Sequence, residues 1–266
     1  MKTSSTNLRT LLILLAVIAM TLPFGLWRLM PQADQLSAVS SPMDSIVNVV
    51  HQISAPPVNL DSLQAAYEKS CDTLAIMRRS IARNYQAAQT DSARKEILKQ
   101  ASVVLTHQMV HEIFPYWYGT DWDFNGITEK PRQGQIACGY FVSTTLKHAG
   151  VKLNRYKVAQ QASSVIVEKL CSPHKIFRNF DKMEDWILKQ ENGLFVVGMD
   201  YHVGFIHKFG DELTFVHSSV LGTAKVVQEP ARKAYLLTNS SILAIGQLTA
   251  SEPFIKAWLR QTFVGI

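Results

Sequence analysis

The stretch Gln135-Ile136-Ala137-Cys138-Gly139-Tyr140-Phe141 delivers a single cysteine to the start of an apolar, helix-compatible segment. We expect a helix over residues 138–148, with Gly150 as its C-terminal cap. At a helix N-terminus, unpaired backbone N–H groups and the positive end of the helix dipole favour a thiolate. Thiolates attack carbonyl carbons. The stretch therefore predicts that Cys138 is a nucleophile.

Two histidines follow at positions that we predict to lie on or beside strands. His202 belongs to the segment 200–205, and His217 belongs to the segment 215–219. Gly210-Asp211 reads as a two-residue hairpin loop between them. In that register the two histidines share one face as diagonal neighbours, roughly 7–8 Å apart at the backbone. A three-residue loop would put them on opposite faces.

One cysteine and two histidines arranged in this way are typical of a cysteine hydrolase. In the predicted mechanism Cys138 adds to an amide carbonyl, His202 takes the thiol proton, and His217 fixes the tautomer of His202. The backbone N–H of Cys138 helps to bind the oxyanion. Gly139 leaves room for the substrate backbone. The competing interpretation is that both histidines are half-buried strand residues without a catalytic role.

The N-terminus has the pattern of an export signal. Lys2 and Arg9 precede an uncharged apolar run over residues 10–27. We interpret residues 1–30 as a cleaved signal peptide or as a membrane anchor, because the run is near the minimum length for a membrane span. Both alternatives predict an exported protein, which is periplasmic or anchored with its main part facing the periplasm or exterior.

The composition suits a globular chain. Of 266 residues, 47% are hydrophobic and 18% are charged, and the formal net charge is +6. This charge fits an anionic cell wall or membrane surface, and it also fits plain solubility. The sequence contains no basic run with interleaved aromatics, the pattern that would indicate binding to nucleic acid. We expect no cofactor and no metal. Cys71 and Cys171 could form a disulfide or could be buried apolar positions.

The rest of the chain predicts an α+β protein. Residues 31–60 read as a linker, 61–113 as a helical hairpin and 114–266 as the catalytic domain. Further helices are expected over residues 158–170, over 181–190 with Asp181 and Glu184 as a capping box, and from Ser251 onward. The expected strands are 194–199, 202–209, 213–219, 222–229 and 241–248.

Several motifs resemble those of the NlpC-like cell-wall cysteine peptidases of the papain-like clan. Pro115-Tyr116-Trp117-Tyr118-Gly119-Thr120 is similar to the Pro-Tyr-x-Trp-Gly-Gly loop of that family, and Cys138-Gly139, His202 and His217 match its triad positions. Ala137-Cys138-Gly139-Tyr140 replaces the usual Asp-Cys-Ser-Gly. The resemblance covers about the last 150 residues. It implies a papain-like fold, cleavage of peptidoglycan stem peptides, and Tyr116 lining the site near the oxyanion.

Two other functions remain open at this point. The same triad could serve an acyltransferase or an amidase that acts on a substrate other than murein, because an amine can intercept an acyl-enzyme as water does. A different class of function is a non-catalytic envelope binding or scaffold protein with a vestigial site.

Overall fold

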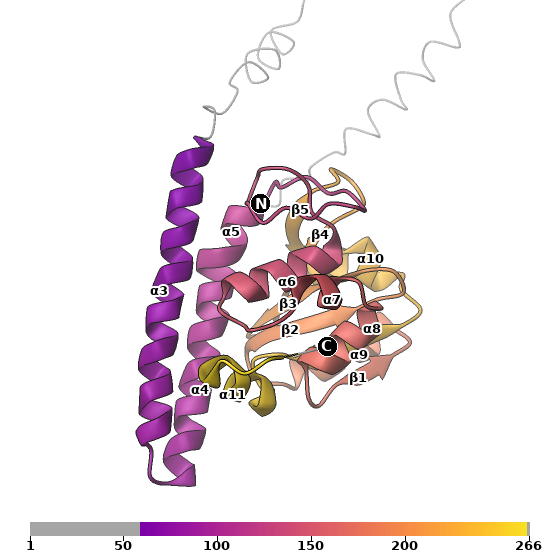
Figure 1. Ribbon diagram of the computed structural model, residues 1–266. Helices are drawn as coiled ribbons and strands as arrows, with labels where there is room; N and C mark the ends of the chain where they lie inside the picture. The colour runs from indigo at the N-terminus through magenta and orange to yellow at the C-terminus, as the bar shows by residue number, and fades with distance from the viewer. Residues whose placement is uncertain (1–58, 265–266) are drawn as a thin grey trace, which may run out of the picture. The chain divides into compact units, whose positions relative to one another are not determined.

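The computed structural model describes residues 59–264, which form an α+β fold around one antiparallel sheet (Figure 1). The six strands have the order β1-β6-β2-β3-β4-β5, and every neighbouring pair is antiparallel. Their bounds are β1 Lys175–Phe177, β2 Gly193–Gly198, β3 Val203–Phe209, β4 Glu212–Ser218, β5 Val226–Pro230 and β6 Leu243–Gln247. The predicted α+β class is confirmed.

A hairpin of two long helices precedes the sheet. Helix α3 spans Leu60–Ala87 and helix α4 spans Asp91–Gln108. The side chain of Asn59 accepts hydrogen bonds from two backbone N–H groups of the first turn, so α3 begins at Leu60, one residue before the predicted start of the hairpin. The end of the second predicted helix is a π-helical turn, Met109–Ile113, which leads into α5, Phe114–Trp117. Pro115 to Trp117 are therefore helical, whereas we expected a loop.

The hairpin and the sheet share one hydrophobic core. The first core cluster joins Tyr67, Leu74 and Leu105 of the hairpin to Phe141 and to Phe205 of β3. Contacts within the chain group residues 58–266 into one compact unit. The hairpin is therefore packed as part of the same body as the sheet, by burial of a helical stripe of apolar side chains.

Helix α6, Cys138–His148, has the bounds predicted from the sequence. Gly150 follows it with φ +84°, and the N–H groups of Gly150 and Val151 donate to the carbonyls of Lys147 and Leu146. This is the Schellman ending that the glycine predicts. The C-terminal helix α11, Glu252–Arg260, also begins where Ser251 and Pro253 indicate.

The structure corrects two predictions and adds one strand. The single helix expected over residues 158–170 is two short helices, α7 Arg155–Ala159 and α8 Ser163–Leu170. Helix α9, Phe180–Leu188, is capped by Asn179, not by a box of Asp181 and Glu184. Glu184 forms an ion pair with Arg232 instead. The short edge strand β1 was not predicted, because three residues give too little alternation to recognise.

The two faces of the sheet pack against different elements. The face that carries Val203, Phe205 and Val216 belongs to the first core cluster with α6. The face that carries Ile206 and Phe215 belongs to a second cluster, which includes residues of α9 and of α10, Tyr235–Thr238. The 3-10 turn η4, Ala231–Lys233, joins β5 to α10.

The predicted signal or anchor (residues 1–30) and nearly all of the predicted linker lie outside the described residues. Among residues 59–264, no helix combines the length and the apolar character needed to span a bilayer.

Candidate functional site

The β3–β4 hairpin has the predicted register. Phe209 pairs with Glu212 around a two-residue loop, in which Gly210 has φ +58°. The pairing continues to Phe205 with Val216. Because side chains alternate along each strand, His202 and His217 lie on the same face, and this prediction is confirmed.

The two histidines belong to a hydrogen-bonded chain that runs from the residue before β3, across β4, to β5. His202 Nε2 lies 2.8 Å from His217 Nδ1, and His217 Nε2 lies 3.0 Å from Glu229 Oε1 on β5. His202 is 6% exposed and His217 is 1% exposed, whereas Glu229 is partly open to solvent. We refer to these three side chains as the histidine relay.

Glu229 was not recognised in the sequence. The β3–β4 loop is two residues long and fixes the register, but seven residues separate β4 from β5. A connection of that length leaves the register open. The observed pairing of Phe215 with Glu229 and of His217 with Val227 places the carboxylate diagonally across from His217, on the same face.

Cys138 lies at the N-terminus of α6, half-buried, beside the start of β3. Its sulfur interacts with the backbone N–H groups of Val203 and Gly139. The loop before it is held by Ser218 Oγ, which donates to the carbonyl of Ile136 at 2.6 Å. The thiol thus contacts the backbone of Val203, the residue that follows His202, in the region where the β3–β4 pairing ends.

Burial raises the pKa of the Cys138 thiol, and the backbone N–H contacts at the helix start lower it by less. The predicted thiolate is therefore wrong for the free protein, because loss of solvation outweighs the helix N-terminus. Burial also lowers the pKa of His202 to about 4. Burial lowers the pKa of His217 as well, and the neighbouring His202 lowers it further. Near neutral pH the site holds a thiol and two neutral imidazoles.

The thiol and the relay approach the start of β3 from different sides. Cys138 packs against the core cluster of α6, whereas the ring of His217 stacks on Phe215 of the other cluster, with centroids 4.0 Å apart. The hydrogen bonds found among residues 59–264 include none between Cys138 Sγ and the His202 ring. Direct contact of sulfur and imidazole therefore remains a prediction.

The two predicted substrate-binding residues have packing roles in the structure. Gly139 is buried, and a Cβ atom there would collide with the carbonyl oxygen of Ala159 in α7. Tyr116 is partly buried, and its ring centroid lies 5.5 Å from that of Tyr67 in α3. Close packing of α6 on α7 is thus a sufficient reason for the glycine. Substrate contact by either residue remains a prediction.

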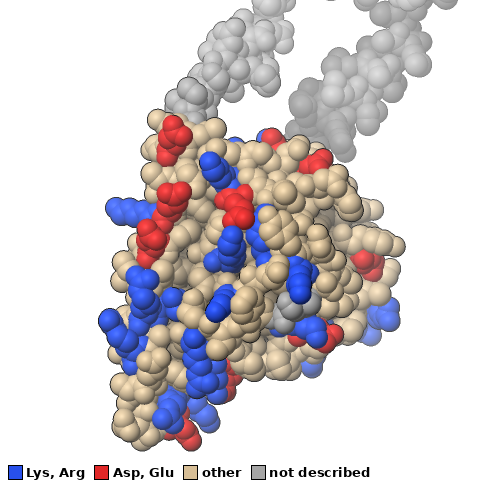
Figure 2. Space-filling model, in the orientation of Figure 1, with Lys and Arg blue, Asp and Glu red and all other residues tan. Residues whose placement is uncertain are grey.

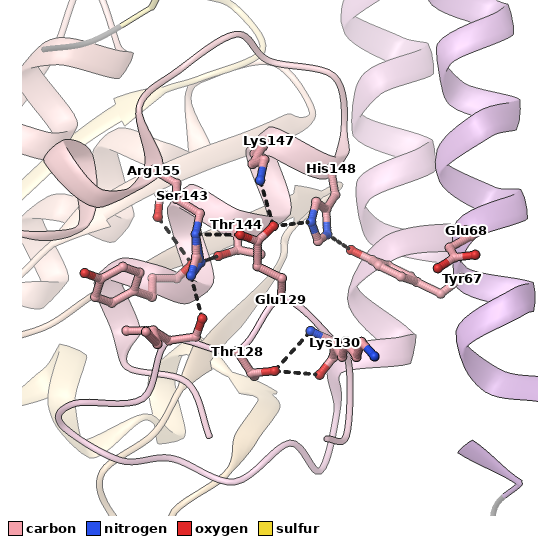
Figure 3. Close-up of polar contacts among 12 residues, drawn as sticks. Tyr67, Glu68, Thr128, Glu129, Lys130, Ser143, Thr144, Lys147, His148 and Arg155 are labelled. Carbon is pink, nitrogen blue, oxygen red and sulfur yellow. Dashed lines mark hydrogen bonds and ion pairs between the residues drawn. The ribbon is translucent and has the colours of Figure 1, made fainter. Parts of the chain in front are cut away.

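A second polar network fixes the far end of α6 (Figure 3). His148 lies between Tyr67 and Glu129: its Nδ1 is 2.8 Å from the Tyr67 hydroxyl, and its Nε2 is 3.4 Å from Glu129 Oε2. Trp117 Nε1 donates to the same hydroxyl at 2.9 Å, and Arg155 Nε pairs with Glu129 at 3.1 Å. This network connects α3, the loop before Cys138 and helix α6.

Two of the pockets on the described residues contain histidines. One of about 970 Å³ lies between α4 and the sheet, is lined by His107, His111 and His207 among others, and does not include Cys138. The other, of about 410 Å³, includes His217 and Glu229 and lies beside η4 and α10. The smaller pocket therefore gives solvent access to the carboxylate end of the relay.

Charge is distributed unevenly along the hairpin. Acidic side chains lie over the N-terminal half of α3, and basic ones over its C-terminal half and the adjoining α4 and α11 (Figure 2). Arg79 and Arg83 contribute exposed cations to this basic region. An anionic surface is the kind of partner that such a region attracts.

The three cysteines of the chain are free, so Cys71 and Cys171 do not form the disulfide that was one of the two expectations. Cys171 is buried and Cys71 is partly buried, which fits the other expectation of apolar positions. Within residues 59–264, no group of three or more His, Cys, Asp or Glu side chains is arranged to hold a metal ion. Comparison with protein-family models, with curated proteins and with solved structures finds no match to this chain.

Proposed function

We propose that the chain is an exported cysteine hydrolase that cleaves an amide bond, with Cys138 as nucleophile, His202 as general base and His217 as the residue that orients His202. The observation that carries the proposal is the buried His202–His217 contact of 2.8 Å, together with a cysteine at a helix N-terminus whose sulfur meets the backbone N–H of Val203, the residue after His202. Buried polar side chains in such a chain are held in one geometry, as catalysis requires.

The finer fold is also a proposal. In papain-like enzymes of the NlpC type, the nucleophile helix packs on an antiparallel sheet that carries the histidines. Contacts of α6 with β3 support that arrangement here, because Phe141 and Phe205 belong to one core and their ring centroids are 6.1 Å apart.

The proposed reaction begins with a neutral pair. The Cys138 sulfur adds to the amide carbonyl carbon while its proton passes to His202. Because His202 Nε2 is hydrogen-bonded to His217, Nδ1 is the ring nitrogen that is left to accept this proton. His202 then protonates the departing amine, and the C–N bond breaks. Water attacks the resulting thioester with His202 as base, which releases the carboxylic acid and restores the thiol.

The helix N-terminus contributes to the same reaction. The backbone N–H of Cys138 belongs to the first turn of α6 and is suited to stabilise an oxyanion. The substrate that we propose is a peptide amide of peptidoglycan, by the resemblance of the motifs. With an amine in place of water the same thioester would give acyl transfer.

A non-catalytic role is the second candidate, and one observation favours it. The Cys138 thiol is largely buried and its pKa is raised, which is the environment of an unreactive cysteine. An envelope scaffold protein with a vestigial site would keep this geometry without turnover.

Digestion of purified peptidoglycan sacculi by the full chain tests the proposal. We expect release of fragments with new amine ends, identified by mass, and loss of release in Cys138→Ala and His202→Ala. Cys71→Ala is the matched control, because it removes a partly buried thiol of α3 away from the relay. Fragments that carry an added amine acceptor would identify acyl transfer. Absence of release, with Cys138 alkylation unchanged by His202→Ala, would establish the scaffold function.

A further inference from the structure

The direction of hydrogen-bond donation along the histidine relay depends on the group at its solvent end, Glu229. His217 uses both ring nitrogens, Nδ1 toward His202 and Nε2 toward Glu229. In the described part of the chain, the contact with His217 is the one side-chain hydrogen bond found for the Glu229 carboxylate. An ionised carboxylate has no proton and can only accept a hydrogen bond. The proton of the outer contact is therefore on His217 Nε2.

The remaining protons follow from this one. A neutral imidazole has one N–H, so His217 Nδ1 has a lone pair and must accept from His202 Nε2–H. His202 then has its only proton on Nε2, and its Nδ1 keeps a lone pair. This is the tautomer that can take a proton from the Cys138 thiol.

We propose that Glu229 is a positioning residue that, through His217, sets the tautomer of His202. Its consequence for catalysis rests on the proposed function. If Glu229 instead carried a proton on the oxygen facing His217, both hydrogen bonds would reverse. His202 Nδ1 would then bear the proton and could not act as a base toward sulfur.

The surroundings of Glu229 permit such a reversal. Its carboxylate shares the pocket of about 410 Å³ with His217 of β4, Lys233 of η4 and Tyr235 of α10, which are the titratable groups that face it. Burial raises the pKa of Glu229 above its ordinary value. Solvent in the pocket can exchange protons with the carboxylate without passing through the position of the thiol.

Three variants distinguish a role of Glu229 in setting the direction of the hydrogen bonds from a role in packing alone. Glu229→Gln keeps the shape of the side chain but presents either a donor or an acceptor to His217. Glu229→Asp keeps the charge on a shorter side chain and is the partial rescue. Glu212→Gln, at an exposed position of β4, is the matched control. Thermal unfolding identifies any variant that has lost the fold.

Two-bond ¹H–¹⁵N spectra of the histidine rings, recorded on the full chain near neutral pH, report the tautomers without any substrate. We expect His202 and His217 to be protonated on Nε2 in the wild type and in Glu212→Gln. Glu229→Gln should divide His202 between its two tautomers. In a serine enzyme a wrong histidine tautomer costs up to about 10⁴-fold in kcat, so we expect amide hydrolysis by Glu229→Gln to fall by at least about tenfold.

The spectra and the hydrolysis rates test separate parts of the proposal. A wild-type His202 protonated on Nδ1, or a Glu229→Gln variant with unchanged tautomers, would overturn the proposal whatever the activity. Tautomers that follow residue 229 in a chain with no hydrolytic activity would support the role of Glu229 and count against the proposed function. A tautomer change with an unchanged rate would overturn the catalytic consequence.

Discussion

Gly139 shows how closely helix α6 is packed. Its Cα faces the carbonyl oxygen of Ala159, at the end of α7, without space for a methyl group. Backbone atoms cannot move aside as a flexible side chain can. The glycine next to Cys138 therefore fixes the distance between α6 and α7.

Gly139→Ala should lower the free energy of unfolding by about 1–3 kcal/mol, because overpacking of a buried contact forces the backbone to shift. Urea unfolding measures the loss. Ala137→Gly, at the neighbouring N-cap position, is the control: it removes one methyl group where Gly139→Ala adds one, and glycine is accepted at an N-cap. A Gly139→Ala variant as stable as the wild type would contradict the packing role.

At the scale of elements, the Tyr67 hydroxyl is the polar connection between α3 and the end of α6. It accepts from Trp117 Nε1, so its own proton is directed to His148 Nδ1. The Trp117 donor is fully buried and has no water to replace the lost bond, whereas His148 is partly exposed.

Tyr67→Phe should reduce the free energy of unfolding by about 1–3 kcal/mol, since it leaves the buried Trp117 donor unsatisfied and removes the hydrogen bond to His148. The measurement is chemical denaturation followed by tryptophan fluorescence. Tyr140→Phe is a matched control, because that hydroxyl only accepts a 3.3 Å bond from Gln160 at an exposed site. Equal effects of the two substitutions would rule out a special role for the network.

For the whole molecule, burial of neutral histidines predicts instability in acid. His202 has an ordinary pKa of 6.5, which falls to about 4 in the fold. Between these values the unfolded chain binds more protons than the folded one. The free energy of unfolding therefore decreases as the pH falls from 6.5 toward 4.

The contribution of His202 to this loss is on the order of 3 kcal/mol, from 2.5 pKa units at about 1.36 kcal/mol each. Burial lowers the pKa of His217 and of His148 also, so their contributions have the same sign. Urea unfolding from pH 7.5 to pH 4.5 tests this. His202→Asn should flatten the dependence, whereas His107→Asn, at an exposed position, should leave it as in the wild type. Stability that is constant across this range would contradict the burial of neutral rings.

Local signals in the chain were sufficient for many elements. Gly150 predicted the end of α6, and Gly210-Asp211 predicted the hairpin register that puts His202 and His217 on one face. Both signals act over a few residues, through positive φ and a short turn. Where the local signal was weak, as at Gln160 and Ala162 between α7 and α8, an apolar pattern alone predicted one helix in place of two.

The sequence by itself determined the α+β class, the bounds of helix α6 and the pairing of the two histidines, because periodicity, caps and tight turns depend on near neighbours. Only the tertiary structure decided that Glu229 completes the relay and that Cys138 is buried enough to raise its pKa. Strand pairing across a seven-residue connection and the solvation of a sulfur atom depend on segments that are distant in the chain. Those segments meet only when the core is formed.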